Sequence, residues 1–409
     1  MTSEIRNIPL GDVVSLVIDY RGKTPKKLGS DWATHGFRAL SAKNIKTGQI
    51  VQHESIRFAD ADLYKRWMKD EIQRRDILIT SEAPFGEVYL WDSDEKIVLS
   101  QRLFALRCKS DFYPPYVYYY MTSTQFQGEL RGRATGTTVT GLRQPELLKC
   151  LINCPNYHEQ QQIADTLAAV DALIAENRKI NHHLEQMAQA IFKSWFVSFE
   201  PFGGEMPAAW ITGKAEDFFE IAIGKTPPRK EPEWFTTNPQ DVVWVSISDM
   251  GSCGMFISDS SEYLTAESVE RFNVRIVPSG TAILSFKLTV GRVAITDGEM
   301  ATNEAIAHFK QANKVTLEYL YCYLKAFDYQ SLGNTSSIAT AVNSKTIKAM
   351  PFVMPDEKVL TDFHATTAPL FEQVRTKLAE NARLAALRDA LLPRLMSGEL
   401  SVADFSDAK

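Results

Sequence analysis

Several short strings in this chain combine residue types that do chemistry in other proteins. Gly22-Lys23-Thr24 and its copy Gly224-Lys225-Thr226 resemble the end of a phosphate-binding loop. That loop needs another glycine five residues before its second glycine, and Val17 and Phe219 occupy those positions. We therefore exclude a phosphate-binding loop at both copies.

A second string, Tyr113-Pro114-Pro115-Tyr116, comes close to the Pro-Pro-aromatic motif of DNA amino-methyltransferases. That motif begins with Asp, Asn or Ser, whose oxygen accepts a hydrogen bond from the target amino group. Tyr113 cannot do this in the same geometry, and no Gly-x-Gly cofactor loop lies upstream. We expect instead a proline turn that opens a helix at Tyr116.

Metal-binding patterns are also incomplete. Cys150, Cys154 and His158 follow one another at four-residue steps, but Pro155 interrupts any helix there and a fourth ligand is not evident. Buried thiols are the simpler interpretation. The five cysteines are few and odd in number, as expected of reduced thiols, so they imply no disulfide framework.

Two further strings lack the partners that catalysis needs. His182 and His183 have no nucleophile or carboxylate pair beside them. Asp356-Glu357-Lys358 resembles part of a nuclease site, yet a second metal-binding carboxylate at the usual spacing is not identifiable, and a charged helix start explains the string more simply. We predict no catalytic residue and no metal site in this chain.

Composition sets the broad class. The chain has 409 residues, 44% hydrophobic and 23% charged, which is typical of a globular protein with two domains. No apolar run reaches the length of about 18 residues that spans a membrane, and the first residues lack a secretory signal, so we expect a cytoplasmic protein. The net charge is −5, but residues 1–155 carry 22 basic and 18 acidic side chains, against 13 and 17 over residues 201–355.

The chain repeats itself at offsets of 200 to 205 residues. Gly22-Lys23-Thr24-Pro25 recurs as Gly224-Lys225-Thr226-Pro227, and Leu40-Ser41 recurs as Val245-Ser246. Residues 134–155 align with residues 334–355 without a gap. We therefore divide the chain into a first domain (1–155), a central helix (156–200), a second domain (201–355) and a C-terminal helix (356–409).

The repeated domains are mixed α and β, so the fold class is α+β. Tyr116 to Leu130 and Leu317 to Leu332 are expected to be helices. Short apolar runs bounded by Gly, Pro and Asp predict strands over 76–80, 88–91, 103–106, 242–247, 281–286 and 292–296.

Heptad patterns follow both domains. Mainly apolar residues recur at alternating steps of four and three residues from Ile163 to Trp195 and from Phe363 to Leu395, as in a heptad repeat. Polar residues interrupt each pattern at its middle, namely Asn177 and Asn181 in the first helix and Lys377 and Asn381 in the second. An antiparallel coiled coil would bring the two middles together, where the polar residues would satisfy one another and fix the register of the pair. The alternative is that these polar positions face solvent where the helices separate.

With these features the chain resembles the specificity (S) subunit of type I restriction-modification systems, the HsdS family. The likeness covers essentially the whole chain. It rests on the repeated Gly-Lys-Thr-Pro string, on Pro155 followed by Glu159-Gln160-Gln161-Gln162-Ile163-Ala164, and on the helix ends 187–196 and 391–400. The second junction, Pro355-Asp356-Glu357-Lys358, departs from the pattern because it lacks the Glu-Gln.

The resemblance implies two target recognition domains that each read one part of a split site in double-stranded DNA. It implies that the helix pair docks two methyltransferase (M) subunits, and that restriction (R) subunits join the complex. S-adenosylmethionine, ATP and Mg would bind those partners, with no cofactor in this chain. The alternative from another class is a non-catalytic coiled-coil scaffold that carries two protein-interaction domains.

Base-reading candidates are the polar residues of the recurrent loops, because bases are specified by Arg, Lys, Asn, Gln and hydroxyl side chains. In the first domain the candidates are Lys23, Lys26, Lys43, Asn44, Arg131, Arg133, Thr137 and Arg143. In the second domain they are Lys225, Arg229, Lys230, Ser248, Asp249, Lys287, Asn343 and Lys345. For any one of them, simple exposure to solvent is the alternative.

A subunit-docking surface is predicted at the end of the first helix. Phe192, Trp195, Phe196 and Phe199 form an apolar cluster too wide for one coiled-coil seam, so part of it should face another protein. Packing against this chain's own domain is the alternative.

Overall fold

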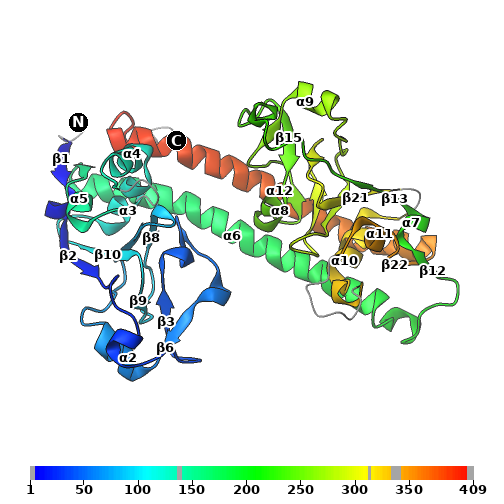
Figure 1. Cartoon of the computed structure of the whole chain (residues 1–409), viewed down its shortest axis with the longest axis horizontal. Coiled ribbons are helices and arrows are strands. Elements are labelled where there is room, and N and C mark those ends of the chain that lie inside the picture. Colours follow the sequence, from blue (N-terminus) through cyan, green and yellow to red (C-terminus); the bar gives the residue numbers. More distant parts are fainter. Residues whose placement is uncertain (1–4, 136–140, 312–314, 333–341, 403–409) are drawn as a thin grey trace. The chain divides into compact units, whose positions relative to one another are not determined.

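The computed structural model describes residues 5–135, 141–311, 315–332 and 342–402, and the chain forms two compact units. The first unit spans residues 1–174 and 383–409, and the second spans residues 175–382. The two long helices therefore each contribute one part to each unit (Figure 1).

The first unit is built on a four-stranded antiparallel sheet with the order β2-β10-β7-β8. These strands are β2 (Val14–Asp19), β10 (Leu103–Cys108), β7 (Ile77–Ser81) and β8 (Phe85–Leu90). Every residue of β7 is buried, and the apolar run over residues 76–80 had predicted a strand here. A smaller sheet has the order β6-β3-β9, with β6 (Arg57–Ala59), β3 (Phe37–Leu40) and β9 (Val98–Leu99), and β4 (Ile45–Lys46) pairs with β5 (Gln49–Ile50).

Short helices complete the first unit. Helix α2 (Ala61–Trp67) begins at Asp60, whose carboxylate accepts a hydrogen bond from the Leu63 amide at 2.7 Å. The others are α1 (Leu10–Val13), α3 (Pro114–Thr122), α4 (Thr124–Gly132) and α5 (Gln144–Leu148). Strand β1 (Arg6–Pro9) pairs with β11 (Leu151–Cys154) and closes the unit beside the long helix.

The second unit repeats this plan. Its central sheet has the order β13-β21-β18-β19-β16, with β13 (Phe219–Ile223), β21 (Ile306–Gln311), β18 (Ala282–Ser285), β19 (Val293–Thr296) and β16 (Phe256–Ile257). The second sheet has the order β14-β17-β15-β20, with β14 (Phe235–Thr236), β17 (Tyr263–Leu264), β15 (Val242–Val245) and β20 (Ala301–Thr302). Strand β12 (Ile211–Lys214) pairs with β22 (Pro351–Met354), and the short helices are α7 (Ala215–Phe218), α8 (Ile247–Ser252), α9 (Ala266–Arg271), α10 (Leu317–Ala326) and α11 (Ser344–Lys348).

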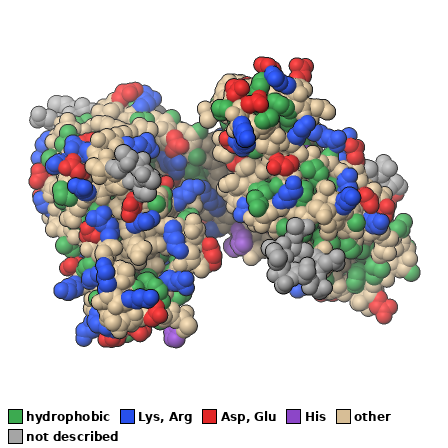
Figure 2. All heavy atoms as spheres, in the orientation of Figure 1, with side chains coloured by type: hydrophobic (Ala, Val, Ile, Leu, Met, Phe, Trp, Pro, Cys, Tyr) green, Lys and Arg blue, Asp and Glu red, His purple; other side chains and the backbone are tan. Residues whose placement is uncertain are grey.

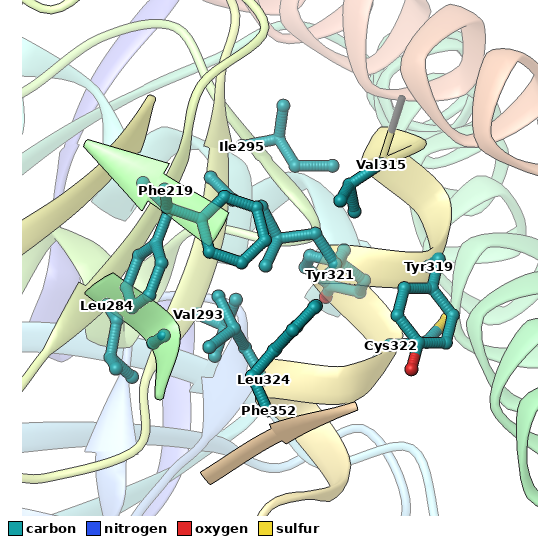
Figure 3. Packing of buried hydrophobic residues seen from close by; sticks show 14 of the residues in the cluster. Phe219, Leu284, Val293, Ile295, Val315, Tyr319, Tyr321, Cys322, Leu324 and Phe352 are labelled. Carbon is teal, nitrogen blue, oxygen red and sulfur yellow. The ribbon is translucent and has the colours of Figure 1, made fainter. Parts of the chain in front are cut away.

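Helix α10 covers the central sheet of the second unit. Figure 3 shows Phe219, Leu284 and Val293 from the strands packing toward the side chains of this helix, all within one buried cluster. The Tyr319 hydroxyl then donates to the Val353 carbonyl at 2.6 Å, and its counterpart Tyr116 donates to the Asn153 carbonyl at 2.5 Å. The same hydrogen bond therefore fixes the helix to the closing strand in both units.

Two expected helices are shorter than the sequence indicated. Tyr116 to Leu130 is broken at Ser123, whose hydroxyl accepts from the Phe126 amide at 3.3 Å and starts α4 as a separate helix. Leu317 to Leu332 is likewise interrupted, because α10 ends at Ala326, Phe327 adopts an extended backbone and a 3-10 turn, η6 (Tyr329–Leu332), follows.

The two long helices, α6 (Tyr157–Phe196) and α12 (Glu357–Ser397), pair antiparallel inside each unit. In the first unit, Arg388 binds Asp171 at 2.8 Å, while Leu395 and Met396 pack in the cluster that contains Ile163 and Leu167. In the second unit, Phe192 and Phe196 lie against Phe363. The predicted antiparallel pairing is confirmed.

The polar middle of the helix pair is partly satisfied. Asn177 donates to the side-chain oxygen of Asn381 at 3.0 Å, as the sequence predicted. Lys377 instead binds Glu380 on its own helix at 2.7 Å. The buried side-chain amide of Asn181 has no hydrogen-bond partner among the described residues, so the expectation that all four residues satisfy one another is wrong.

Candidate nucleic-acid interface

Four loops of the first unit meet at one edge of its central sheet, which we call the first loop edge. They are loops 20–25, 41–44, 82–84 and 100–102, which follow β2, β3, β7 and β9. The β10 start lies between the ends of β2 and β7, because Phe104 pairs with Asp19 and Leu103 pairs with Thr80. Backbone hydrogen bonds then tie Arg102 to Ser81 at 2.8 Å and Gln101 to Ala42 at 3.0 Å.

The second unit has the same arrangement, the second loop edge, made of loops 224–227, 246–249, 286–290 and 303–305. The Gly224 amide donates to the Ile306 carbonyl at 3.1 Å, and the Phe286 amide donates to the Ala305 carbonyl at 2.9 Å. The Asn303 amide donates to the Val245 carbonyl at 3.0 Å. Corresponding loops therefore gather at corresponding edges.

The Gly-Lys-Thr-Pro string has a structural role in the second unit. A Cβ on Gly224 would clash with Thr302 and with the Asn303 carbonyl, so only glycine fits there. The amide of Lys225 also donates to the Thr302 carbonyl at 2.9 Å. In the first copy a Cβ on Gly22 would meet nothing within 4 Å. The string turns the chain at the loop edge, which agrees with the exclusion of a phosphate-binding loop.

Nine of the predicted base-reading residues are exposed, and their side chains make no hydrogen bond or ion pair within the described part of the chain. They are Lys26, Lys43, Arg131, Arg143, Lys225, Lys230, Ser248, Lys287 and Lys345. Lys43, Lys225, Ser248 and Lys287 lie on the loop edges. Arg143 lies beside the first, since the preceding Leu142 amide donates to the Ser81 carbonyl at 3.0 Å. Arg131 lies on α4 and Lys345 on α11, outside these loops.

Three predicted polar residues hold the fold instead. Asn44 is only 1% exposed, and its amide bonds to Ser41, Ser55 and the backbone of the 51–52 segment. Its counterpart Asp249 accepts four hydrogen bonds from Ser246 and Ser261. Burial raises the pKa of Asp249, but these bonds outweigh burial and hold the pKa below its usual value. In the same way, Asn343 caps α11 by accepting from the Thr346 amide at 3.1 Å.

Three predicted cations are also engaged within the chain. Lys23 donates to the Trp67 carbonyl, and burial followed by the charge of Lys69 lowers its pKa. Arg133 pairs with Glu129 at 2.9 Å. Arg229 pairs with Glu262 at 2.8 Å and lies 4.0 Å from the ring centroid of Phe235. Base contact by these three residues stays a prediction. To contact bases, their side chains would have to leave the partners that they bind within the chain. Thr137 lies outside the described residues.

The loop edges are charged but not uniformly basic. Figure 2 shows Lys and Arg side chains spread over the visible face of each unit among acidic ones. On the second loop edge Thr226 donates to Glu304. Burial raises the pKa of Glu304, yet the Thr226 bond and the nearby Lys287 and Arg229 charges hold it below its usual value. A carboxylate therefore lies beside the cations at this edge.

The predicted docking cluster belongs mainly to the core of the second unit. Phe192 is 2% exposed and Phe196 is buried, and both pack on Tyr319 and Phe363. The expectation that these two side chains face another protein is corrected, because the second unit already covers them. Trp195 and Phe199 are half-buried, and docking through them stays a prediction.

Sequence reasoning missed the apex of one hairpin at each loop edge. Between β7 and β8 the apex holds Glu82, which pairs with Arg102 at 3.1 Å, and Ala83 in a left-handed conformation. Between β18 and β19 the corresponding apex holds Lys287, which was predicted, and Leu288, which was not. The repeat at an offset of 205 could have aligned the two apices, but neither Ala nor Leu indicates a left-handed backbone from sequence.

No group of three or more His, Cys, Asp or Glu residues that could hold a metal ion occurs among residues 5–135, 141–311, 315–332 and 342–402. Cys150 and Cys154 are buried, and burial raises the pKa of each thiol to about 12. No helix in the described ranges is long and apolar enough to cross a membrane.

Comparison with known families identifies the repeated domains. The model of the type I restriction modification DNA specificity domain matches the chain twice, over residues 3–186 and 207–360. The chain belongs to the type I restriction specificity-subunit family. Each match contains one loop edge, so the repeat found in the sequence and the structure is a repeat of the DNA specificity domain.

Individual relatives agree with the family match. The MjaIX specificity subunit of Methanocaldococcus jannaschii is 26% identical, covering 80% of this chain and 78% of its own. The HindI specificity subunit of Haemophilus influenzae is 23% identical over 87% of this chain and 94% of its own. The crystal structure of the type I restriction-modification S subunit from M. genitalium covers 96% of both chains at 15% identity with a TM-score of 0.53, which shows that the specificity-subunit fold is shared.

Proposed function

We propose that this specificity subunit reads a two-part DNA target, one half-site with each loop edge. The observation that carries the proposal is the occurrence of the same loop edge in both units, each inside a match to a DNA specificity domain. The exposed cations of the first loop edge, such as Lys43, would contact phosphates or guanine, while polar residues such as Ser248 would contact bases at the second.

Partner subunits would carry out the catalytic reactions. Two methyltransferase subunits would supply S-adenosylmethionine-dependent methylation of adenine, and restriction subunits would supply ATP- and Mg-dependent cleavage, in the cytoplasm. This chain would contribute no catalytic residue, in line with the incomplete motifs at Tyr113 and at Asp356. In the structure Tyr113 opens α3 and bonds Asp165 at 3.1 Å, and Asp356 accepts from the Trp210 indole at 3.2 Å, so both side chains serve the fold.

A binding titration tests this division of labour. A chain of net charge −5 neutralises few phosphates, so the isolated subunit should bind duplex DNA weakly. Reconstitution with methyltransferase subunits should give tight binding to the target and weak binding to a duplex with scrambled half-sites. Equal site-specific affinity with and without the partners would contradict the division of labour. Absence of any sequence preference in the full complex would favour the scaffold alternative.

A further inference from the structure

Leu288 is unusual among the apolar side chains of this protein. It is 97% exposed at the apex of the β18–β19 hairpin, although Phe286, two residues earlier, is 1% exposed. Its φ of 60° lies in the left-handed region, which an L residue with a branched side chain rarely adopts. The chain thus holds a large apolar side chain in water on a strained backbone, at a loop edge.

The hairpin is held rigidly in this shape. The Ser285 hydroxyl donates to the Thr289 carbonyl at 2.5 Å and accepts from the Arg292 amide at 3.1 Å. Ser285 is fully buried, and Gly291 supplies the second left-handed residue with a φ of 92°. Arg292 is in turn anchored to the Ile247 carbonyl at 2.6 Å. The apex therefore presents Leu288 in a fixed position and would lose little conformational entropy on binding.

The first unit contains a hairpin at the corresponding place with different side chains. Thr80 accepts from the Glu87 amide at 2.8 Å, as Ser285 does from Arg292, and Gly86 has a φ of 76°. At an offset of 205, Ala83 with a φ of 42° corresponds to Leu288, and Glu82 corresponds to Lys287. The two positive-φ positions of the apex recur while the size and charge of its side chains differ, as expected of an element that reads different sequences in the two half-sites.

We propose that the Lys287–Leu288 apex enters the major groove of the second half-site, where Leu288 contacts the C5 methyl group of a thymine. This inference rests on the proposed function and assigns one base-specific contact to it. Apolar side chains in the major groove distinguish thymine by this methyl group. Lys287, exposed beside it, would contact a neighbouring phosphate.

The surroundings favour DNA over a protein partner. Leu288 is flanked by the exposed Lys287 and Thr289, and Lys225 is exposed on the same loop edge. The core of a protein interface is instead a contiguous apolar patch depleted in lysine. A single apolar contact surrounded by cations and hydroxyl groups matches a groove, where phosphates and base edges lie next to a methyl group.

The test uses the complete complex of this chain with its methyltransferase subunits and duplexes that carry the target. Each thymine of the second half-site is replaced in turn by uracil, which keeps the base pair and removes only the methyl group. We expect one replacement to weaken binding by the wild type about threefold to fivefold, the effect of one buried methyl group. Leu288→Ala should weaken binding to the thymine duplex about tenfold. The variant complex should then bind the duplex with that uracil as tightly as the thymine duplex. Uracils in the first half-site should have the same effect on the variant as on the wild type.

Two further variants separate binding from folding. Leu288→Gly should raise the unfolding temperature, because glycine adopts the left-handed backbone without strain, and yet weaken DNA binding. Ile211→Ala, at a residue that is 61% exposed on β12 in the same unit, should change neither the affinity nor the uracil response.

Failure of the Leu288 contact and failure of the proposed function would give different results. A wild-type complex that binds its target specifically, with Leu288 variants of unchanged affinity or a uracil response that persists in Leu288→Ala, overturns this inference and leaves the proposed function intact. Loss of methyltransferase-subunit assembly by Leu288→Ala, measured on a sizing column without DNA, would show that Leu288 contacts protein, and would also overturn it. A wild-type complex without preference for the target over a scrambled duplex would defeat the proposed function itself.

Discussion

The two recognition domains share a framework and differ at the surface that the framework presents. In both, a tyrosine of the helix that covers the sheet bonds to the closing strand, and a serine after the parallel strand caps the next turn. The hairpin apices share a positive φ at the corresponding residue but carry Glu82-Ala83 in one unit and Lys287-Leu288 in the other. The comparison shows that loop position is fixed by backbone and capping bonds, which leaves side-chain chemistry at the edge free to differ between half-sites.

The domains also differ inside. The second unit buries His308, which lies 2.6 Å from the Thr302 hydroxyl. The first unit has the apolar residues Ala105 and Leu99 at the corresponding places, both fully buried. The second core therefore contains a titratable group at a place where the first core has apolar residues. Acid should therefore lower the stability of the second unit more than that of the first.

The largest expected effect concerns the helix ends, which pack unequally in the two units. Phe192→Ala should lower the free energy of unfolding by about 3 to 5 kcal/mol, because it removes a ring buried among four other aromatic residues. Leu392, the residue at an offset of 200, is half-buried, so Leu392→Ala should cost about 1 to 2 kcal/mol. Denaturant unfolding of both variants measures the difference, and equal costs would show that the helix ends pack alike.

Acid should destabilise the second unit next most strongly. Burial, followed by the charge of Arg275, lowers the pKa of His308 from 6.5 to about 4. The unfolded chain therefore binds this proton first, so stability is lost as the pH falls from about 6.5 toward 4, by about 2 kcal/mol at pH 5. His308→Gln should flatten this pH dependence. An unchanged slope in the variant would show that His308 is not kept neutral in the fold.

A smaller effect is expected at the paired caps of the loop edges. Asn44→Ala and Asp249→Ala each remove the N3 partner of a capping box and leave the Ser41 or Ser246 amide without its side-chain acceptor, so each should cost about 1 to 2 kcal/mol. Thermal unfolding of the two variants measures this cost. Wild-type stability combined with loss of sequence-specific binding would indicate that these residues read bases after all.

The smallest effect tests the exposed neighbours of those caps. Lys43 and Ser248 correspond at an offset of 205 and are both exposed. Lys43→Gln should leave stability unchanged, weaken binding of all sequences alike and reduce the dependence of log Kd on log salt by about 0.9, the value for one phosphate contact. Ser248→Ala should not change that salt dependence. Identical salt slopes for Lys43→Gln and the wild type would place Lys43 away from phosphates.

Much of the fold could be predicted from the sequence because the chain supplies its own comparison. The repeat and the heptads located both domains, both long helices and the antiparallel pairing, and the apolar runs located the strands of both central sheets. Helix ends were less accessible, because the cap at Ser123 competes locally with a helix that the apolar pattern would have continued.

The candidate interface was harder to predict than the fold. The recurrent loops that carry Lys43 and Ser248 lie at the loop edges, yet the sequence could not separate Lys43, which is exposed, from Asn44, which is buried one residue later. That separation depends on a 3-10 turn and on bonds to residues 51–55. The aromatic cluster at Phe192 was ambiguous for a similar reason, since apolar residues beyond one seam can face a partner or, as here, the chain's own domain.

Independent reading of one half-site by each domain follows from the repeated loop edges. Its most direct test replaces residues 1–150 with the matching domain of a relative that has a different target, and maps methylated adenines in the DNA of a host that also carries the methyltransferase subunit. We predict that one half-site changes to that of the donor while the other half-site stays as it is in the wild type. Simultaneous change of both half-sites, in a complex that still methylates DNA, would contradict independent reading by the two domains.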